Sequence, residues 1–313
     1  MSIQNHVFHT KHDFTPELGW AAFQLLAEIG TGGMKPADLH AIAKAIASPL
    51  TKRSALNKLL AAMLEVGLVE RTREEVRLSR AGEALAAGIG RYETGFCIAV
   101  HCLYAWKWMW DGDVTTASPS WSYREVLRQL LAAGSAGIDA DEIVLRVVSA
   151  AERFDAVKVS FSRSSVSAVT IWLASQALPL IKKKGQHIFL HNSSAPLPDS
   201  VRLHVAALCA LGGGEATLND ENRQLLAESF LIRADEWVGP VTDLTRDPGE
   251  FLFIPTVPNR VIFKGSEDPF IAWMVKSAGR NSMSTADGKS NLNGQNGFVP
   301  NITRGSQREL ADY

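Results

Sequence analysis

The sequence predicts a mainly α-helical protein with small β-hairpins, an α+β fold that contains two similar modules. Residues 15–88 hold three stretches with apolar residues at helical spacing, followed by two short alternating segments. Residues 121–191 repeat this order with little similarity in the residues themselves. The chain has 313 residues, 46% of them hydrophobic, which is enough apolar material for a sizeable core and two or three domains.

The first module begins at Thr15, which can cap a helix that has Pro16 in its first turn and ends at GTGG. The segment KPADLHAIAKAIA predicts a second helix. A third starts near Thr51, and its expected buried stripe consists of Leu56, Leu59, Leu60, Met63 and Leu64. LVER and VRLS then predict two strands joined by residues 72–75, and RAGEALAAG predicts a short closing helix.

Between the modules, GFCIAVHCLYAWKWMW is aromatic and mostly apolar, which predicts a buried helix. In the second module, helices are expected over WSYREVLRQLLAAG, over IDADEIVLRVVSAAERF with Asp139 as its cap, and over FSRSSVSAVTIWLASQAL. LPLIKKKGQHIFLH predicts a hairpin that turns at Lys184 and Gly185.

Residues 199–214 and 219–237 predict two further helices, and EFLFIPTVPNR and VIFKG predict two strands. Pro255 and Pro258 place the first of these strands at a sheet edge, because proline cannot donate to a ladder. From Ser277 onward the sequence is rich in Ser, Asn and Gly, which predicts a flexible tail. The expected domains are therefore 1–90, a linker helix in 91–120, a second module in 121–192, an α+β domain with the outline of a third module in 193–276, and the tail in 277–313.

Three helices followed by a hairpin is the order of a winged helix-turn-helix. Residues 15–88 resemble that superfamily through SALNKLLAAMLEVGLVER and VRLSRAGEAL. The fold implied is a tandem array of winged helices. The whole layout also resembles accessory proteins of bacterial phage-defence or DNA-modification operons, such as the DpdG-like proteins of the deazaguanine DNA-modification cluster.

In a helix-turn-helix the second helix of the pair enters the major groove of DNA, and its first residues meet the base edges. Arginine and lysine can reach phosphates or guanine there, and asparagine can read adenine. The candidate DNA contacts of the first module, on its third helix and its hairpin, are Lys52, Arg53, Ser54, Asn57, Lys58, Arg73 and Arg77.

The second module repeats this basic front. Residues 121–191 contain nine Lys and Arg against six Asp and Glu, so a local positive surface is expected although the whole chain has a net charge of −1. The corresponding candidates are Lys158, Arg163, Ser164, Ser165, Lys182, Lys183 and Lys184. The alternative for the first module is a solvated helix face on a winged domain that is used for contacts with proteins. The alternative for the second module is that KKKG is only a soluble turn.

No catalytic motif is present: the sequence lacks a P-loop, a dinucleotide-binding G-x-G-x-x-G, H-E-x-x-H and G-x-S-x-G. We therefore expect no catalysis and no cofactor, with an enzyme site in residues 195–275 as the remaining alternative. His6, His9 and His12 have a spacing at which they could share a helix face, but no cysteine or carboxylate cluster accompanies them. Cys97, His101 and Cys102 lie in an apolar segment, where core packing is expected instead of a metal site.

The main hypothesis is a non-catalytic DNA-binding protein of the bacterial cytoplasm, either the DNA-engaging subunit of a defence or DNA-modification system or a transcription regulator. The rival hypothesis is an assembly subunit whose winged helices dock proteins instead of DNA. The expected partners are double-stranded DNA, proteins of the same operon and a second copy of the chain as a homodimer. No membrane segment and no signal peptide is expected, because no long apolar run and no basic-then-apolar N-terminus occurs.

Overall fold

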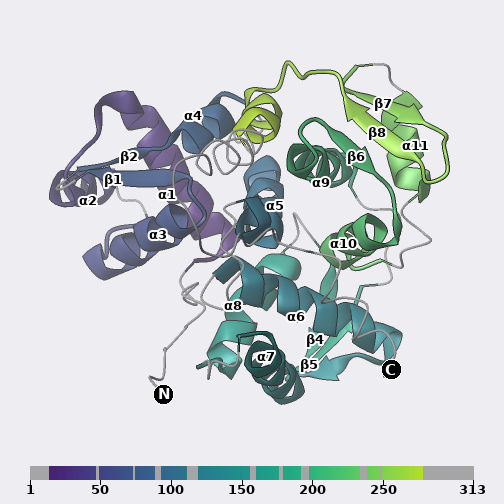
Figure 1. The fold of residues 1–313 in the computed structure, drawn as a ribbon. Helices are drawn as coiled ribbons and strands as arrows, with labels where there is room; N and C mark the ends of the chain where they lie inside the picture. The colour runs from purple at the N-terminus through teal and green to yellow at the C-terminus, as the bar shows by residue number, and fades with distance from the viewer. Residues whose placement is uncertain are drawn as a thin grey trace, which may run out of the picture. The chain divides into compact units, whose positions relative to one another are not determined.

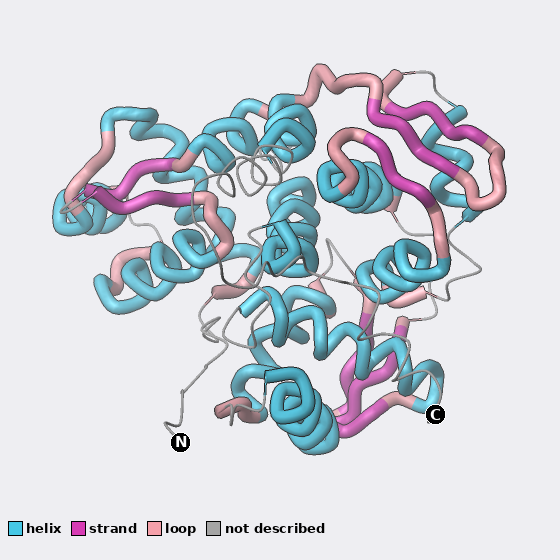
Figure 2. The backbone as a smooth tube through the Cα atoms, viewed as in Figure 1, coloured by secondary structure: helices cyan, strands magenta, loops and turns pink. Residues whose placement is uncertain are grey.

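Helices dominate the structure, and its strands form small antiparallel sheets (Figure 2). The computed structural model describes residues 14–46, 49–72, 75–88, 93–110, 119–155, 160–175, 179–191, 197–232, 238–246 and 249–277. Within these residues, the prediction of a mainly helical α+β protein is confirmed. The flexible tail that we predict from Ser277 lies almost wholly outside them.

The first module, residues 14–88, has the predicted order of elements (Figure 1). Thr15 Oγ1 accepts a hydrogen bond from the Leu18 amide over 3.3 Å, and Pro16 opens the helix. Gly30 ends it with a φ of 77°. The elements are α1 (Pro16–Ile29), η1 (Gly30–Gly32), α2 (Pro36–Ala45), α3 (Arg53–Glu65), β1 (Val69–Thr72), β2 (Glu75–Leu78) and α4 (Arg80–Ala87).

A strand segment between the first two helices of the module was not predicted. Met34 forms a bridge with Val76 of β2, in which each backbone amide donates to the other residue's carbonyl over 2.9 Å. The hairpin is therefore extended on its β2 side by a short piece of chain. Local periodicity gives no sign of it, because one bridged residue has no alternation to detect.

The same order of elements recurs twice more in the chain. The second module, residues 119–191, contains α6 (Pro119–Ala133), η3 (Gly134–Ala136), β3 (Ile138–Asp139), α7 (Ala140–Asp155), α8 (Arg163–Leu173), β4 (Ile181–Lys184) and β5 (His187–Leu190). The third module, residues 197–263, contains α9 (Pro198–Leu211), β6 (Glu215–Thr217), α10 (Asp220–Phe230), α11 (Val238–Arg246), β7 (Phe251–Ile254) and β8 (Arg260–Phe263).

In the second and third modules the additional strand is long enough to give a three-stranded sheet. The strand orders are β3-β5-β4 and β6-β8-β7, and every pairing is antiparallel. β7, which leads into Pro255, is an edge strand as predicted. In each module the short strand between the first two helices pairs with the last strand of the hairpin, as Met34 does in the first.

The helix α5 (Glu93–Trp110) lies between the first and second modules in the sequence and contacts α1, α6 and α9, which belong to three different modules. Its residues from Phe96 to Trp106 are buried. The Phe96 ring lies 5.1 Å from the Phe23 ring and 6.2 Å from that of Trp172. The predicted burial is confirmed for residues 96–106 of this aromatic segment, whose all-round apolar surface is explained by neighbours on several sides.

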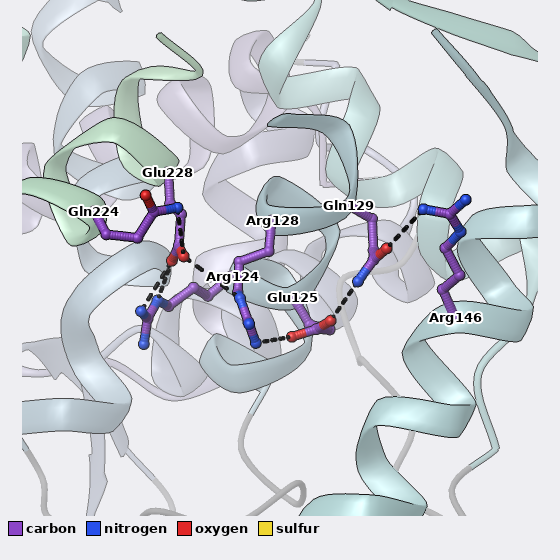
Figure 3. A network of polar contacts seen from close by, with 7 residues as sticks. All are labelled: Arg124, Glu125, Arg128, Gln129, Arg146, Gln224 and Glu228. Atoms are coloured by element: carbon purple, nitrogen blue, oxygen red, sulfur yellow. Dashed lines mark hydrogen bonds and ion pairs between the residues drawn. The ribbon is translucent and has the colours of Figure 1, made fainter. Parts of the chain in front are cut away.

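A polar network joins α6 to α10 and α7 (Figure 3). Glu228 accepts from Arg124 over 2.9 Å and lies 3.4 Å from Arg128, which also pairs with Glu125 over 2.9 Å. Glu125 and Glu228 are each only 3% exposed. Burial raises the pKa of the Glu125 carboxyl, and the guanidinium of Arg128 opposes that rise. Two guanidinium groups thus compensate two buried carboxylates where the second and third modules meet.

No helix in the described part of the chain is long and apolar enough to cross a membrane.

Candidate nucleic-acid interface

A groove of about 580 Å³ lies in the first module between the start of α2, the helix α3 and the hairpin β1–β2. Figure 1 shows these elements grouped together. The lining residues are Lys35, Pro36, Ala37, Arg53, Asn57, Leu60, Ala61, Leu64, Val69, Arg71 and Val76. The groove brings two predicted DNA contacts, Arg53 and Asn57, together with two cations that were not predicted, Lys35 and Arg71.

The periodicity of α3 divides it between the core and the groove. Leu56, Leu59 and Met63 are at most 1% exposed. Each of residues 53, 57, 60, 61 and 64 lies three or four positions from another member of the set, so they share a different stripe, which lines the groove. Leu64 is 46% exposed, so its predicted place in the buried stripe is wrong. It lies near the end of α3 on the groove stripe, away from Leu56 and Leu59.

The hairpin has two faces, and only one meets the groove. Val69 and Arg71 are two residues apart on β1, and Val76 is paired with Arg71 across the ladder, so all three lie on the groove face. Arg77 is paired with Glu70 on the opposite face, where its Nε donates to Glu70 Oε1 over 2.6 Å. Arg71, which was not predicted, therefore lines the groove, and the predicted DNA contact Arg77 does not. Arg73 lies outside the described residues.

The groove is electrostatically one-sided. Its described lining contains three cations and no carboxylate. Arg53 and Arg71 are exposed, and neither forms an ion pair with another described residue. These groups can donate to phosphate oxygens, and the Asn57 amide can both donate to and accept from a base edge. Leu60, Leu64, Val69 and Val76 supply an apolar surface between the polar groups.

The other candidates on α3 lie beside the groove. Lys52, at the N-cap of α3, and Ser54 are exposed, whereas Lys58 is half-buried. They extend the polar front at the start of the helix, but they do not line the groove.

In the second module, the predicted front is largely occupied by contacts within the protein. Nε and Nη2 of Arg163 donate to the two carboxylate oxygens of Asp141. Ser164 is exposed and its Oγ lies 2.7 Å from that of Ser162. Ser165 is only 4% exposed, because it lies on the face of α8 that packs into the core and not on the exposed front with Arg163 and Ser164. Lys158 lies outside the described residues.

The three lysines of β4 alternate between two faces of their sheet. The Nζ of Lys183 donates to Thr170 Oγ1 over 2.8 Å, and partial burial lowers the pKa of this amine. Lys182 and Lys184 are exposed on the other face. The run KKKG therefore does not present three equivalent cations to one ligand.

His101 and His204 form a buried pair that the sequence analysis did not predict. His101 Nε2 donates to the Ser229 carbonyl over 2.9 Å, and its Nδ1 accepts from the Tyr123 hydroxyl over 2.8 Å. The His204 ring lies 5.2 Å from that of His101. Burial lowers the pKa of both rings, that of His101 to about 4. These rings are neutral core groups that tie α5 to α6, α9 and α10.

The described residues contain no group of three or more His, Cys, Asp or Glu side chains that could hold a metal ion. Cys97, Cys102 and Cys209 are buried free thiols whose pKa values are raised by burial. His6, His9 and His12 lie outside the described residues.

The sequence contained a signal for Arg71, because it is two residues from the apolar Val69 on a predicted strand. Lys35 and Asp141 carried no such signal, since their relevance depends on how α2 and α7 approach the next helix.

Comparison with known proteins gives a likeness of fold only. No family model and no curated protein matches the chain. A solved structure described as "SspB crystal structure" superposes with a TM-score of 0.53 over 88% of this chain and 94% of that chain, at 13% sequence identity. At this identity the likeness concerns the arrangement of elements and carries no functional assignment.

Proposed function

We propose that the three modules are winged helix-turn-helix units arranged in tandem. Each has three helices and a hairpin in the same order, and in each the segment between the first two helices pairs with the last strand of the hairpin, through a single bridge in the first module and a short strand in the other two. In such a unit the third helix is the one that enters a DNA major groove. In the first module that helix is α3.

The proposed function is binding of double-stranded DNA by a protein without catalysis of its own. The observation that carries it is the convergence of Lys35, Arg53, Asn57 and Arg71 on a groove whose described lining has no carboxylate. A phosphodiester backbone needs several donors and no competing negative charge, because its affinity comes mainly from cations that displace condensed counterions. Asn57, one turn into α3, supplies the amide that would contact a base edge in this proposal.

The cellular role we propose is that of a cytoplasmic DNA-engaging subunit of a bacterial defence or DNA-modification system, or of a transcription regulator. It rests on the proposed winged-helix modules and on the absence of known catalytic motifs from the sequence. The first module would anchor the protein on DNA in either role.

The test is a fluorescence-anisotropy titration of the full chain on random-sequence duplex DNA, from about 50 to 200 mM salt. The wild type should bind at the low end of this range, with affinity that falls steeply as salt rises. The double change Arg53→Ala and Asn57→Ala should weaken binding and lower the salt slope by about one unit, because one phosphate contact is lost. Arg80→Ala, an exposed arginine at the start of α4, is the matched control and should bind like the wild type.

A second function, docking of a partner protein, is favoured by the apolar part of the same groove. Leu64 is exposed next to Leu60, Val69 and Val76. An apolar surface of this kind makes no favourable contact with the phosphate backbone of DNA. The change Leu64→Ala separates the two functions, because it removes apolar area and leaves every cation in place. If the groove serves DNA, Leu64→Ala keeps the salt slope of the wild type. No wild-type binding to duplex at about 50 mM salt would end the DNA proposal and leave protein docking.

A further inference from the structure

The first two modules have matching positions around the third helix, and two of these positions differ in charge between the modules. Arg53 opens α3 and Arg163 opens α8. The residue just before the second helix is Lys35 in the first module and Asp139 in the second. The second residue of that helix is Ala37 in the first module and Asp141 in the second. Two positions of the first module that are basic or neutral are thus acidic in the second.

The hairpins match in the same way. Val69 and Arg71 on β1 correspond to Ile181 and Lys183 on β4 by position in the strand. Arg71 reaches the open groove, whereas the Lys183 amine donates to Thr170. Thr170 is the eighth residue of α8, and the eighth residue of α3 is Leu60, which offers Arg71 no acceptor.

Both cations that correspond to the groove arginines are therefore engaged inside the second module. Arg163 donates to the two oxygens of Asp141, and the exposed Lys183 donates its amine to Thr170 Oγ1. The pKa of the Asp141 carboxyl is lowered by its hydrogen bonds with Arg163, and Asp139 adds to the electrostatic environment of Arg163. In the third module the corresponding positions are Val238 and Phe253, which carry no charge.

We infer that duplex DNA is engaged through the groove of the first module alone, and that Asp141 silences the corresponding face of the second module by pairing with Arg163. This inference rests on the proposed DNA binding and assigns it to one of three similar modules. The second and third modules are then free to contact other parts of the chain or other proteins.

Asp141 prevents DNA binding at Arg163 mainly because its negative charge stays nearby, and less because the ion pair itself is strong. The Arg163–Asp141 pair is exposed, and exposed pairs open readily. An opened pair would still leave the Asp141 carboxylate beside any phosphate that Arg163 reached. The site would gain no net positive charge and release no counterion, so it would add nothing to the salt slope.

The test compares two matched arginine changes in the full chain, Arg53→Ala and Arg163→Ala, by salt-dependent anisotropy on random duplex DNA. Both residues occupy the first position of their helix and both are exposed, so circular dichroism should show an unchanged fold. Arg53→Ala should lower the salt slope by about one unit, and Arg163→Ala should leave it unchanged.

Two substitutions exchange the charge that lies beside the first arginine of the third helix between the two modules. Ala37→Asp should bring a carboxylate to Arg53 and lower the salt slope by about one unit, while its neutral control Ala37→Asn should bind like the wild type. Asp141→Asn should release Arg163 and raise the slope by up to about one unit, a gain that the added change Arg163→Ala should remove.

The outcomes separate this inference from the proposed function. If the wild type binds DNA but Arg163→Ala costs as much as Arg53→Ala, or Ala37→Asp or Asp141→Asn has no effect, the assignment to the first module is wrong and DNA binding stands. If the wild type does not bind duplex at low salt, the proposed function itself fails, and this inference fails with it.

Discussion

Arg77 and Glu70 lie directly opposite each other on the β1–β2 ladder, and the guanidinium Nε of Arg77 donates to the Glu70 carboxylate over 2.6 Å. This pair occupies the face of the hairpin that points away from the groove. Arg71, six residues earlier, occupies the other face and lines the groove.

The first prediction uses this opposition. Arg71→Ala should weaken DNA binding and lower its salt slope by about one unit, because a groove cation is lost. Arg77→Ala removes the same charge from the opposite face of the same hairpin and should leave the slope unchanged. Anisotropy titrations of both variants measure the difference, and equal losses would mean that bulk charge, not the groove, attracts DNA.

The second prediction concerns the network between α6 and α10. Within the described part of the chain, Arg124→Ala leaves the buried Glu228 with only the 3.4 Å contact to Arg128 as an ion pair. The free energy of unfolding should fall toward the lower end of roughly 3–5 kcal/mol, as for other buried pairs that lose one partner. Arg146→Ala breaks the exposed pair with Glu142 and should cost about 0–1 kcal/mol. Urea denaturation measures both, and similar costs would show that the network does not stabilise the α6–α10 contact.

The third prediction is a pH dependence caused by Glu65 at the end of α3. Burial raises the pKa of this carboxyl to about 8, and its Oε2 has no hydrogen-bond partner among the described residues. Because the folded state binds this proton more tightly than the unfolded state, its contribution to stability is present below about pH 4.5 and is lost as the pH rises through 8.

Glu65→Gln should abolish that loss, so its advantage over the wild type should grow between pH 5 and 9 by on the order of 1–3 kcal/mol. Glu83→Gln, an exposed carboxylate on α4, is the matched control and should run parallel to the wild type. Urea unfolding at several pH values measures both variants. Parallel curves for wild type and Glu65→Gln would show that the carboxyl is hydrated in the folded protein.

The fourth prediction separates the two stripes of α3. Leu59 is fully buried, and Leu59→Ala should lower the free energy of unfolding by about 2–5 kcal/mol through lost burial and a residual cavity. Leu64→Ala, five residues further along the same helix, should cost less than about 1 kcal/mol because its side chain is 46% exposed. Thermal and urea unfolding test both, and a large cost at Leu64 would mean that another segment covers it.

The sequence alone determined most of the helices and the hairpins, together with the residues that begin and end the first helix, whereas α11 and the short strands β3 and β6 were not predicted. Thr15, Pro16 and Gly30 each act within a single turn, and the apolar spacing of α3 is a property of its 13 neighbouring residues. Such signals are local, so they can be read without knowledge of the rest of the chain. The buried character of α5 could be read for the same reason.

Only the tertiary structure decided which cations face an open groove. The pairing of Met34 with Val76, the contact of Arg163 with Asp141 and the packing of Ser165 all join residues that are distant in sequence or depend on which helix face meets the core. Arg53 and Arg163 are the same residue type with the same charge. Each is the first residue of its helix, and a serine follows each of them in the sequence. What differs is the side chain that the preceding helix brings next to each arginine, and that contact exists only once the helices have packed.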